Sequence, residues 1–252
     1  MKSLKESLFD TDLADRDYYQ YHPKTTIGLI KCINEQLDIQ GPEANLNIID
    51  VSSITDMTSV FGNCKRREEF NGDISEWNVS NVKDMSGLFS NCAKFNGNIS
   101  KWDVSKVTTM RGMFWGCKTF NSDISKWDVS KVKDMSNMFW RCWEFNGDIS
   151  EWDVSNVRLM INMFYECGNF NKDISKWDVS NVRSMDCMFK DCKRFNQDIS
   201  KWDVRNVVSM IQMFNWCDKF NQDLSKWNVK DDVTTNQIFA NCKSLKKYPK
   251  WM

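Results

Sequence analysis

Histidine and proline are scarce in this chain of 252 residues, which has one histidine, His22, and three prolines. A single histidine excludes every catalytic scheme that needs two. The sequence also lacks the G-x-S-x-G nucleophile motif and the glycine-rich loops that hold phosphates. We therefore expect a protein that is not an enzyme and that uses no cofactor.

An excess of charge of either sign is also missing, because 34 Lys and Arg balance 34 Asp and Glu. A neutral chain gives no electrostatic reason to bind nucleic acid or a membrane surface. No stretch approaches the roughly 18 apolar residues of a membrane helix, and charges interrupt the first ten residues, unlike a secretion signal. We expect a cytoplasmic protein, with display at a cell surface or on a virion as the alternative.

What the chain does contain is a repeat. From Phe70 to Ser244 it consists of seven consecutive units of 25 residues without insertion or deletion. Each unit is close to F-N-x-D-I-S-K-W-D-V-S-N-V-x-x-M-x-x-M-F-x-x-C-x-x, and a degenerate eighth unit precedes them, with a surface bulge at residues 65–69. Such a period is typical of solenoids, in which stacked units share one core.

Apolar spacing within each unit predicts two short elements. Trp102 and Val104 alternate as on a strand, and Met110, Met113, Phe114 and Cys117 fall at i, i+3, i+4 and i+7, as on a helix of about two turns. We therefore expect an α/β, leucine-rich-repeat-like solenoid of about eight coils. At roughly 5 Å per coil, the stack would be about 40 Å long before its caps.

The ends of the array differ from its middle. Residues 23–40 predict a helix with Ile27, Ile30, Ile33 and Leu37 on its buried side, ended by Gly41 and Pro42. The expected domains are an N-terminal arm (1–22), a capping helix with its entry turn (23–44), the repeats (45–244) and a C-terminal cap (245–252).

The repeat F-N-x-D-I-S-x-W-D-V-S-N-V-x-x-M-x-x-M-F-x-x-C resembles that of the BspA-like leucine-rich-repeat surface proteins, over about residues 42–244. This resemblance implies a solenoid used for adhesion or partner binding, without catalysis. The chain departs from the surface members because its sequence shows neither a secretion signal nor an anchor.

Several columns of identical residues have both a structural and a functional interpretation. Seven Cys at one repeat position fit small apolar filler with free thiols, because no C-x-x-C pair suits zinc and a parallel ladder rarely suits disulfides. Two Asp columns, at positions equivalent to Asp123 and Asp128, fit turn formation and a surface neutralised by lysines, with calcium binding as the alternative. We expect no metal site. The Asn column is expected to bond backbone groups, and the Trp column to form core.

One column varies instead of repeating. The residue after the second Phe of each unit is aromatic in three consecutive units, as Trp115, Trp140 and Tyr165, and Trp143 is a further aromatic outside the repeat pattern. Clustered exposed aromatics are typical of binding hot spots. We therefore predict that these four residues bind a protein partner, although the rings could instead pack on one another. The alternative function is a structural or adhesin-type component whose repeats act mainly as a spacer.

Overall fold

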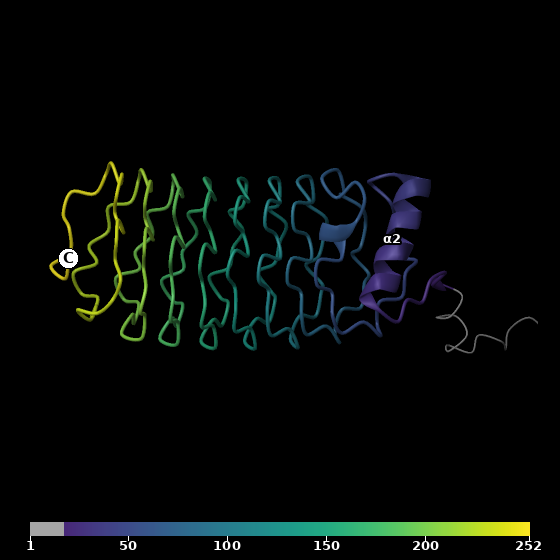
Figure 1. Cartoon of the computed structure of the whole chain (residues 1–252), viewed down its shortest axis with the longest axis horizontal. Helices are drawn as coiled ribbons and strands as arrows, with labels where there is room; N and C mark the ends of the chain where they lie inside the picture. Colours follow the sequence, from purple (N-terminus) through teal and green to yellow (C-terminus); the bar gives the residue numbers. More distant parts are fainter. Residues whose placement is uncertain (1–17) are drawn as a thin grey trace, which may run out of the picture.

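The coils of this protein follow one another in a single row, and one helix covers one end of the row (Figure 1). We describe residues 18–252 of a computed structural model. The elongated stack of roughly 25-residue coils confirms the predicted repeat architecture. Most of the predicted N-terminal arm, residues 1–17, lies outside the described residues.

Helix α2 spans Thr26–Gln40 and caps the row. The Thr25 hydroxyl accepts from the Gly28 N–H at 3.1 Å, and the Gly41 N–H, at φ 83°, donates to the Leu37 carbonyl at 3.1 Å. Gly41 therefore ends the helix as predicted. The helix face that meets the first coil is formed by Leu29, Ile33, Gln36 and Leu37.

The predicted buried side of this helix was partly wrong. Ile27 is 81% exposed, and Ile30 is only partly buried. Leu29, Ile33 and Leu37 follow one another at steps of four, and this line of residues lies a third of a turn away from Ile27. Leu29, which the sequence-based assignment left out, belongs to the core.

The predicted strand in each coil is absent from the described residues, and neighbouring coils pair instead through single parallel β-bridges at another position of the unit, Thr109 in the coil of Trp102. One such series links residue 84 to 109, 109 to 134, and so on through 234. The alternation that predicted a strand is nevertheless present, because Trp102 and Val104 are both buried. A bridge of one residue per coil provides hydrogen bonds only to the backbone groups next to it. Because the chain then turns, no strand forms.

The predicted short helix is also wrong in the seven regular coils, because this segment is a series of tight turns there, and the degenerate first unit has a single 3-10 turn, η1, at Phe61–Asn63. Alternate amides donate to the next coil, as Gly112 does to Ser136 and Phe114 to Met138, at 2.8 and 2.9 Å. The amides between them donate three residues back, and backbone φ is positive at residues 112 and 116. A left-handed residue every fourth position cannot belong to an α-helix.

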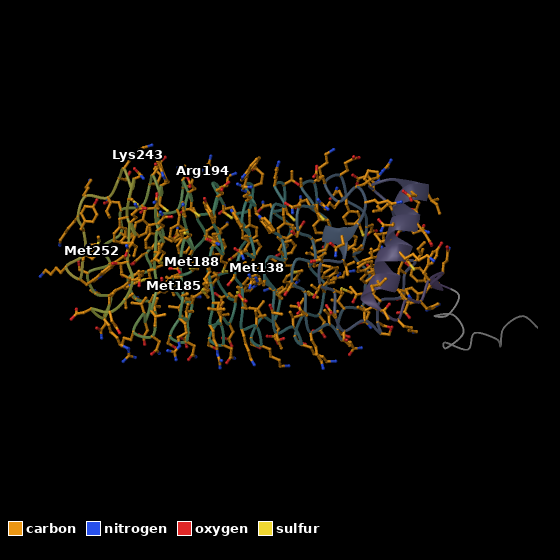
Figure 2. All side chains as sticks on the ribbon, viewed as in Figure 1. Met138, Met185, Met188, Arg194, Lys243 and Met252 are labelled. Carbon is orange, nitrogen blue, oxygen red and sulfur yellow. The ribbon has the colours of Figure 1, made fainter. Side chains whose placement is uncertain are left out.

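The core is a set of aromatic ladders that run through all coils. Phe114 stacks on Phe120, which begins the next unit, at 3.9 Å between ring centroids, and on Phe139 of that same next unit at 5.6 Å. Tryptophans of one column donate their indole N–H to a carbonyl of the preceding coil, as Trp152 does to Ile124 at 3.1 Å. The labelled methionines, Met138, Met185 and Met188, lie inside this stack, whereas Arg194 and Lys243 lie at its edge (Figure 2).

Both ends of the row extend the repeat. The Gln20 N–H donates to the Ile48 carbonyl and the Asp50 N–H donates to the Tyr21 carbonyl, both at 2.8 Å, so residues 20–21 pack on the first coil. At the other end, Trp251 stacks on Trp227 at 6.2 Å and donates to the Leu224 carbonyl at 2.9 Å. The bulge at residues 65–69 is exposed, as predicted.

Candidate functional site

Most surface columns repeat the same bond in every coil. In the Asn column, the backbone N–H of one residue donates to the side-chain oxygen of the preceding one, as Asn121 does to Asn96 and Asn146 to Asn121, both at 2.8 Å. This ladder confirms the structural role predicted for these residues. Because each coil carries the same bond, the column gives a partner no distinct position to recognise.

Both Asp columns form turns with the residue two positions on. The Asp123 carboxylate accepts from the Ser125 N–H at 2.9 Å, and Asp128 accepts from Ser130 at 3.0 Å. The predicted turn role of the first column is confirmed. In the second column the same turn bond is present, and lysine also acts on it, because hydrogen bonds from Ser130 and then the charge of Lys131 lower the pKa of Asp128. The described residues contain no group of three His, Cys, Asp or Glu positioned to hold a metal ion.

These bonds change the acid behaviour of the carboxylates. Backbone hydrogen bonds from Ser125, Ser150 and Ser175, followed by their hydroxyls, lower the pKa of Asp123, Asp148 and Asp173 below the ordinary value of 3.8. A folded-state pKa below the unfolded one stabilises the fold above the ordinary pKa, and this stabilisation is lost as pH falls through the folded-state value.

We therefore predict that changing Asp123, Asp148 and Asp173 to Asn will flatten the loss of stability below about pH 4 and will lower stability slightly at neutral pH, where the ionised carboxylate is the stronger acceptor. Asn98 already forms the same turn with Ser100 at 3.1 Å, so the amide preserves the acceptor. Urea unfolding midpoints from pH 7 to pH 2 measure this. The matched triple Ala variant, which removes the acceptor, should be weaker at every pH. An unchanged acid transition in the Asn variant would contradict the prediction.

The Cys column lies in the core, and all ten cysteines are free. Ladder thiols donate to a carbonyl of the preceding coil, as Cys142 does to Phe114 at 2.9 Å. Burial raises the pKa of the Cys64 thiol to about 12 and that of Cys242 to about 11. A buried thiol with a raised pKa is a poor nucleophile, which fits the predicted role as filler.

We expect alkylation of the native protein to reach only the three half-buried thiols, Cys32, Cys187 and Cys242, within the time that labels an exposed cysteine. Denaturing freshly purified protein should make all ten reactive. Mass spectrometry after timed iodoacetamide treatment counts both sets. Rapid labelling of Cys142 in the folded state, or fewer than ten thiols after denaturation, would contradict this expectation.

Trp115, Trp140 and Tyr165, which we call the aromatic stripe, lie against one another on the turn face of three consecutive coils. Ring centroids are 5.2 Å apart between Trp115 and Trp140 and 5.4 Å apart between Trp140 and Tyr165, with the planes within 11° of parallel. All three side chains are half-buried. The sequence allowed two interpretations, exposed rings and rings that pack on one another. Both hold in part, because the rings pack on one another and still keep part of their surface in solvent.

Cations lie over part of this stripe. The Lys190 ammonium lies 5.1 Å from the Tyr165 ring centroid, and the Arg141 guanidinium lies 5.5 Å from that of Trp140. Backbone bonds such as Arg141 N–H to the Tyr165 carbonyl, at 2.8 Å, fix the register of the rings. The Trp140 indole nitrogen is buried with no hydrogen-bond partner among the described residues. An unpaired buried donor is costly until an acceptor reaches it.

Trp143 does not join the rings of the stripe. It is 46% exposed, and its ring lies beneath the Lys118 ammonium, 4.8 Å from the ring centroid. Trp216, the other exposed tryptophan, lies beneath Lys193 at 4.9 Å. The structure thus brings together three of the four residues predicted to bind a partner and places the fourth beside a lysine.

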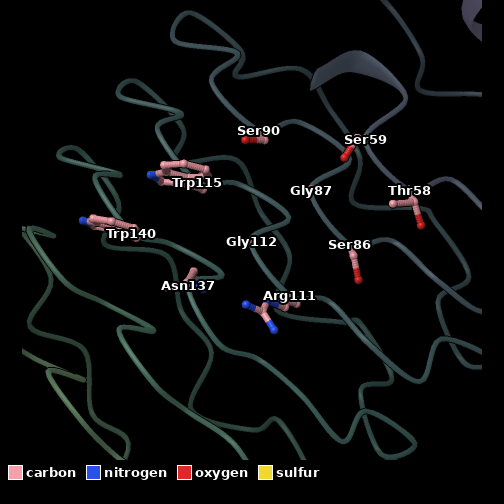
Figure 3. Close-up of a pocket in the computed structure, with 10 residues that line it drawn as sticks. All are labelled: Thr58, Ser59, Ser86, Gly87, Ser90, Arg111, Gly112, Trp115, Asn137 and Trp140. Carbon is pink, nitrogen blue, oxygen red and sulfur yellow. The ribbon is translucent and has the colours of Figure 1, made fainter. Parts of the chain in front are cut away.

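A shallow depression of about 280 Å³ lies beside Trp115, where the stripe ends (Figure 3). Trp115 and Trp140 form one side of it, and three serines, two glycines, Thr58 and Asn137 form the rest, with Arg111 at its edge. Sequence reasoning missed this feature. The signal was present in the stripe's own column, which changes from Gly62 and Ser90 to Trp115 in successive coils.

The described residues include no helix long and apolar enough to cross a membrane.

The chain was compared with curated proteins and with solved structures. None of the curated proteins matches the chain. One solved structure, the crystal structure of a TLR13–ssRNA13 complex, aligns at 8% identity and a TM-score of 0.18, covering 88% of this chain and 48% of that one. This chain thus spans about half the length of that chain, and so low a score supports no argument.

A family model, by contrast, matches most of the chain. It covers residues 34–150 and again residues 133–251, and its description is "Mycoplasma protein of unknown function, DUF285". The two matches overlap within the regular coils and together extend from helix α2 to the last described turn. The chain therefore belongs to the DUF285 family.

Proposed function

We propose that this protein is a non-enzymatic module that binds a protein partner through the aromatic stripe. The observation that carries the proposal is contrast between columns. The Asn, Asp, Cys and Trp columns repeat one contact per coil, whereas the stripe has large half-exposed rings in three coils only. Such a preformed surface loses little conformational entropy when it binds.

A further observation supports this proposal. The rings are held rigid by mutual stacking and by backbone bonds between coils, as a binding hot spot requires. Catalysis has no comparable support, because the Asp carboxylates have equivalent environments that shift their pKa in one direction, whereas acid–base chemistry needs unequal ones.

The fold family, the class of partner and the cellular location are further parts of this proposal. We propose that the fold is a leucine-rich-repeat-like solenoid related to the BspA-like proteins, on the strength of the repeat motif. We propose a protein rather than nucleic acid or a membrane as the partner, because the charges balance. A reducing, cytoplasmic location is proposed from the ten free thiols. The uniform Lys, Asp and Ser face favours the alternative, a spacer in an adhesin-type or virion-associated assembly.

Changing Trp115, Trp140 and Tyr165 to Ala should abolish partner capture at a modest cost in stability. Each substitution should cost about 1 kcal/mol, because a half-exposed stacked ring contributes less than the about 3–5 kcal/mol of a fully buried one. The measurement compares cross-linked proteins captured from source cells by the wild type and the variant, with thermal unfolding of both. Trp216→Ala removes an equally large exposed ring elsewhere and is the matched control.

The outcome separates the two functions. A binding module should lose a captured protein in the triple variant and retain it in Trp216→Ala. A spacer should capture the same proteins with both variants. A stability loss in the triple variant as large as that of three buried aromatics would show that the stripe is core, and would contradict the proposal.

A further inference from the structure

We propose that the depression beside Trp115 receives an aromatic side chain of the partner that has a carboxylate residue next to it in sequence. This inference rests on the proposed binding role of the aromatic stripe. It adds the place of contact and the chemistry of the group that is recognised.

The stack of rings is closed at one end and open at the other. At the closed end, the Lys190 ammonium covers Tyr165 at 5.1 Å. At the open end, Trp140 covers one face of Trp115, and the two preceding coils place Ser90 and Gly62 in the same column. The Asn91 N–H donates to the Trp115 carbonyl at 2.6 Å, so the coil that carries Ser90 is the direct neighbour. A ring placed above Ser90 would continue the stack at the spacing already present.

The neighbouring column leaves room for such a ring. Gly87 and Gly112 are glycines, so this position carries no side chain in two successive coils, whereas the next coil carries Asn137. The room lies at Gly112, where an added Cβ would meet nothing closer than the Trp115 Cβ at 3.9 Å, whereas one at Gly87 would lie 2.9 Å from the Ser59 hydroxyl. The resulting space of about 280 Å³ is open to solvent (Figure 3). Pockets that enclose a whole small molecule usually measure about 300–1,000 Å³. The depression therefore suits one protruding side chain of a larger partner.

The positive charge of Arg111 determines which residue of the partner can lie beside the ring. Arg111 lies at the edge of the depression and is exposed, and its guanidinium takes part in no ion pair with the described residues. A guanidinium pairs best with a carboxylate, through two parallel hydrogen bonds. A basic residue of the partner would be repelled there. A Phe, Tyr or Trp beside an Asp or Glu satisfies both the open ring face and the free cation.

A labelled peptide tests this in the full-length protein. The probe is a fluorescein-labelled Gly-Asp-Phe-Asp-Gly peptide, and its anisotropy reports binding. Ser90→Trp should weaken binding by about tenfold or more, because the protein's own ring then fills the place. The next two coils carry Trp in this column, so the variant should fold, which circular dichroism checks. Arg111→Gln should weaken binding several-fold, and Trp216→Ala should leave it unchanged.

Several results would overturn the inference. They are equal binding by Ser90→Trp and wild type, equal binding of a probe with Leu in place of Phe, and no binding of the Phe probe. Displacement of the probe by AMP at lower concentration than by unlabelled peptide would identify a nucleotide site instead. If the captured partner is lost by the triple Ala variant and kept by Ser90→Trp, the proposed function stands and only this inference fails.

Discussion

Replacing Trp152 with alanine is expected to lower the free energy of unfolding by about 3–5 kcal/mol. The side chain is 3% exposed and lies in the centre of the row, within 6.4 Å of the Phe139 ring centroid. Its removal would leave a cavity between coils. It would also leave the Ile124 carbonyl without the indole N–H that now donates to it at 3.1 Å. Both losses act at once, because the ring and its N–H belong to one side chain.

Two control variants separate the loss of the buried ring from the loss of the hydrogen bond. Trp152→Phe keeps a ring in the core and should lose mainly the hydrogen bond, at a cost of about 1–3 kcal/mol. Trp143→Ala removes an exposed tryptophan nine positions earlier and should cost about 1 kcal/mol or less. Urea unfolding followed by far-ultraviolet circular dichroism measures all three. Equal losses in Trp152→Ala and Trp143→Ala would contradict the central role of the Trp ladder.

Changing Leu29, Ile33 and Leu37 of helix α2 to Ala should remove the stability of the N-terminal coils. All three side chains are 0% exposed. Large-to-Ala changes in a core cost about 2–5 kcal/mol each, so even the smallest sum approaches the about 5–15 kcal/mol that stabilises a whole domain. Because each coil contacts only its neighbours, an uncapped end should fray inwards and expose apolar rings.

The same helix supplies the control for this second experiment. Ile27 and Ile39 are 81% and 74% exposed, so changing both to Ala alters the helix by similar chemistry without touching the core. That variant should remain monodisperse, with a stability within about 1 kcal/mol of wild type. Size-exclusion chromatography and urea unfolding distinguish the two variants. A capping triple variant as stable as this control would show that α2 is not the cap.

The repeat, its period and its capped end were all predictable, because stacked coils need an identical pattern of apolar residues in each unit. The local structure was not. The spacing i, i+3, i+4 and i+7 of Met110, Met113, Phe114 and Cys117 also arises when four-residue turns follow one another. Only the pairing of alternate amides with the next coil, as for Gly112 and Ser136, distinguishes the two. That pairing joins residues 24 apart in sequence and leaves no mark on the local pattern.

The candidate site was predictable in part for a similar reason. Trp115, Trp140 and Tyr165 recur at one repeat position, so their proximity follows from the period alone. Trp143 occupies a different column, in which Lys118 stands one 25-residue unit earlier, so its position beside that lysine also follows from the period. The depression depends on the small side chain of Ser90 and on the absence of a side chain at Gly112. It becomes visible when the coils before the stripe are compared with those within it.

The bulge at residues 65–69 shows how this protein tolerates change in length. Its residues are exposed, and Phe70 directly after it is fully buried in the ladder, so the extra chain leaves the register of the next coil intact. Loss or duplication of a whole 25-residue unit would likewise preserve the ladder contacts that every coil shares. Recombination between repeated gene segments could therefore lengthen or shorten the array from one generation to the next. The distance between the cap and the stripe would change while the binding chemistry stayed the same.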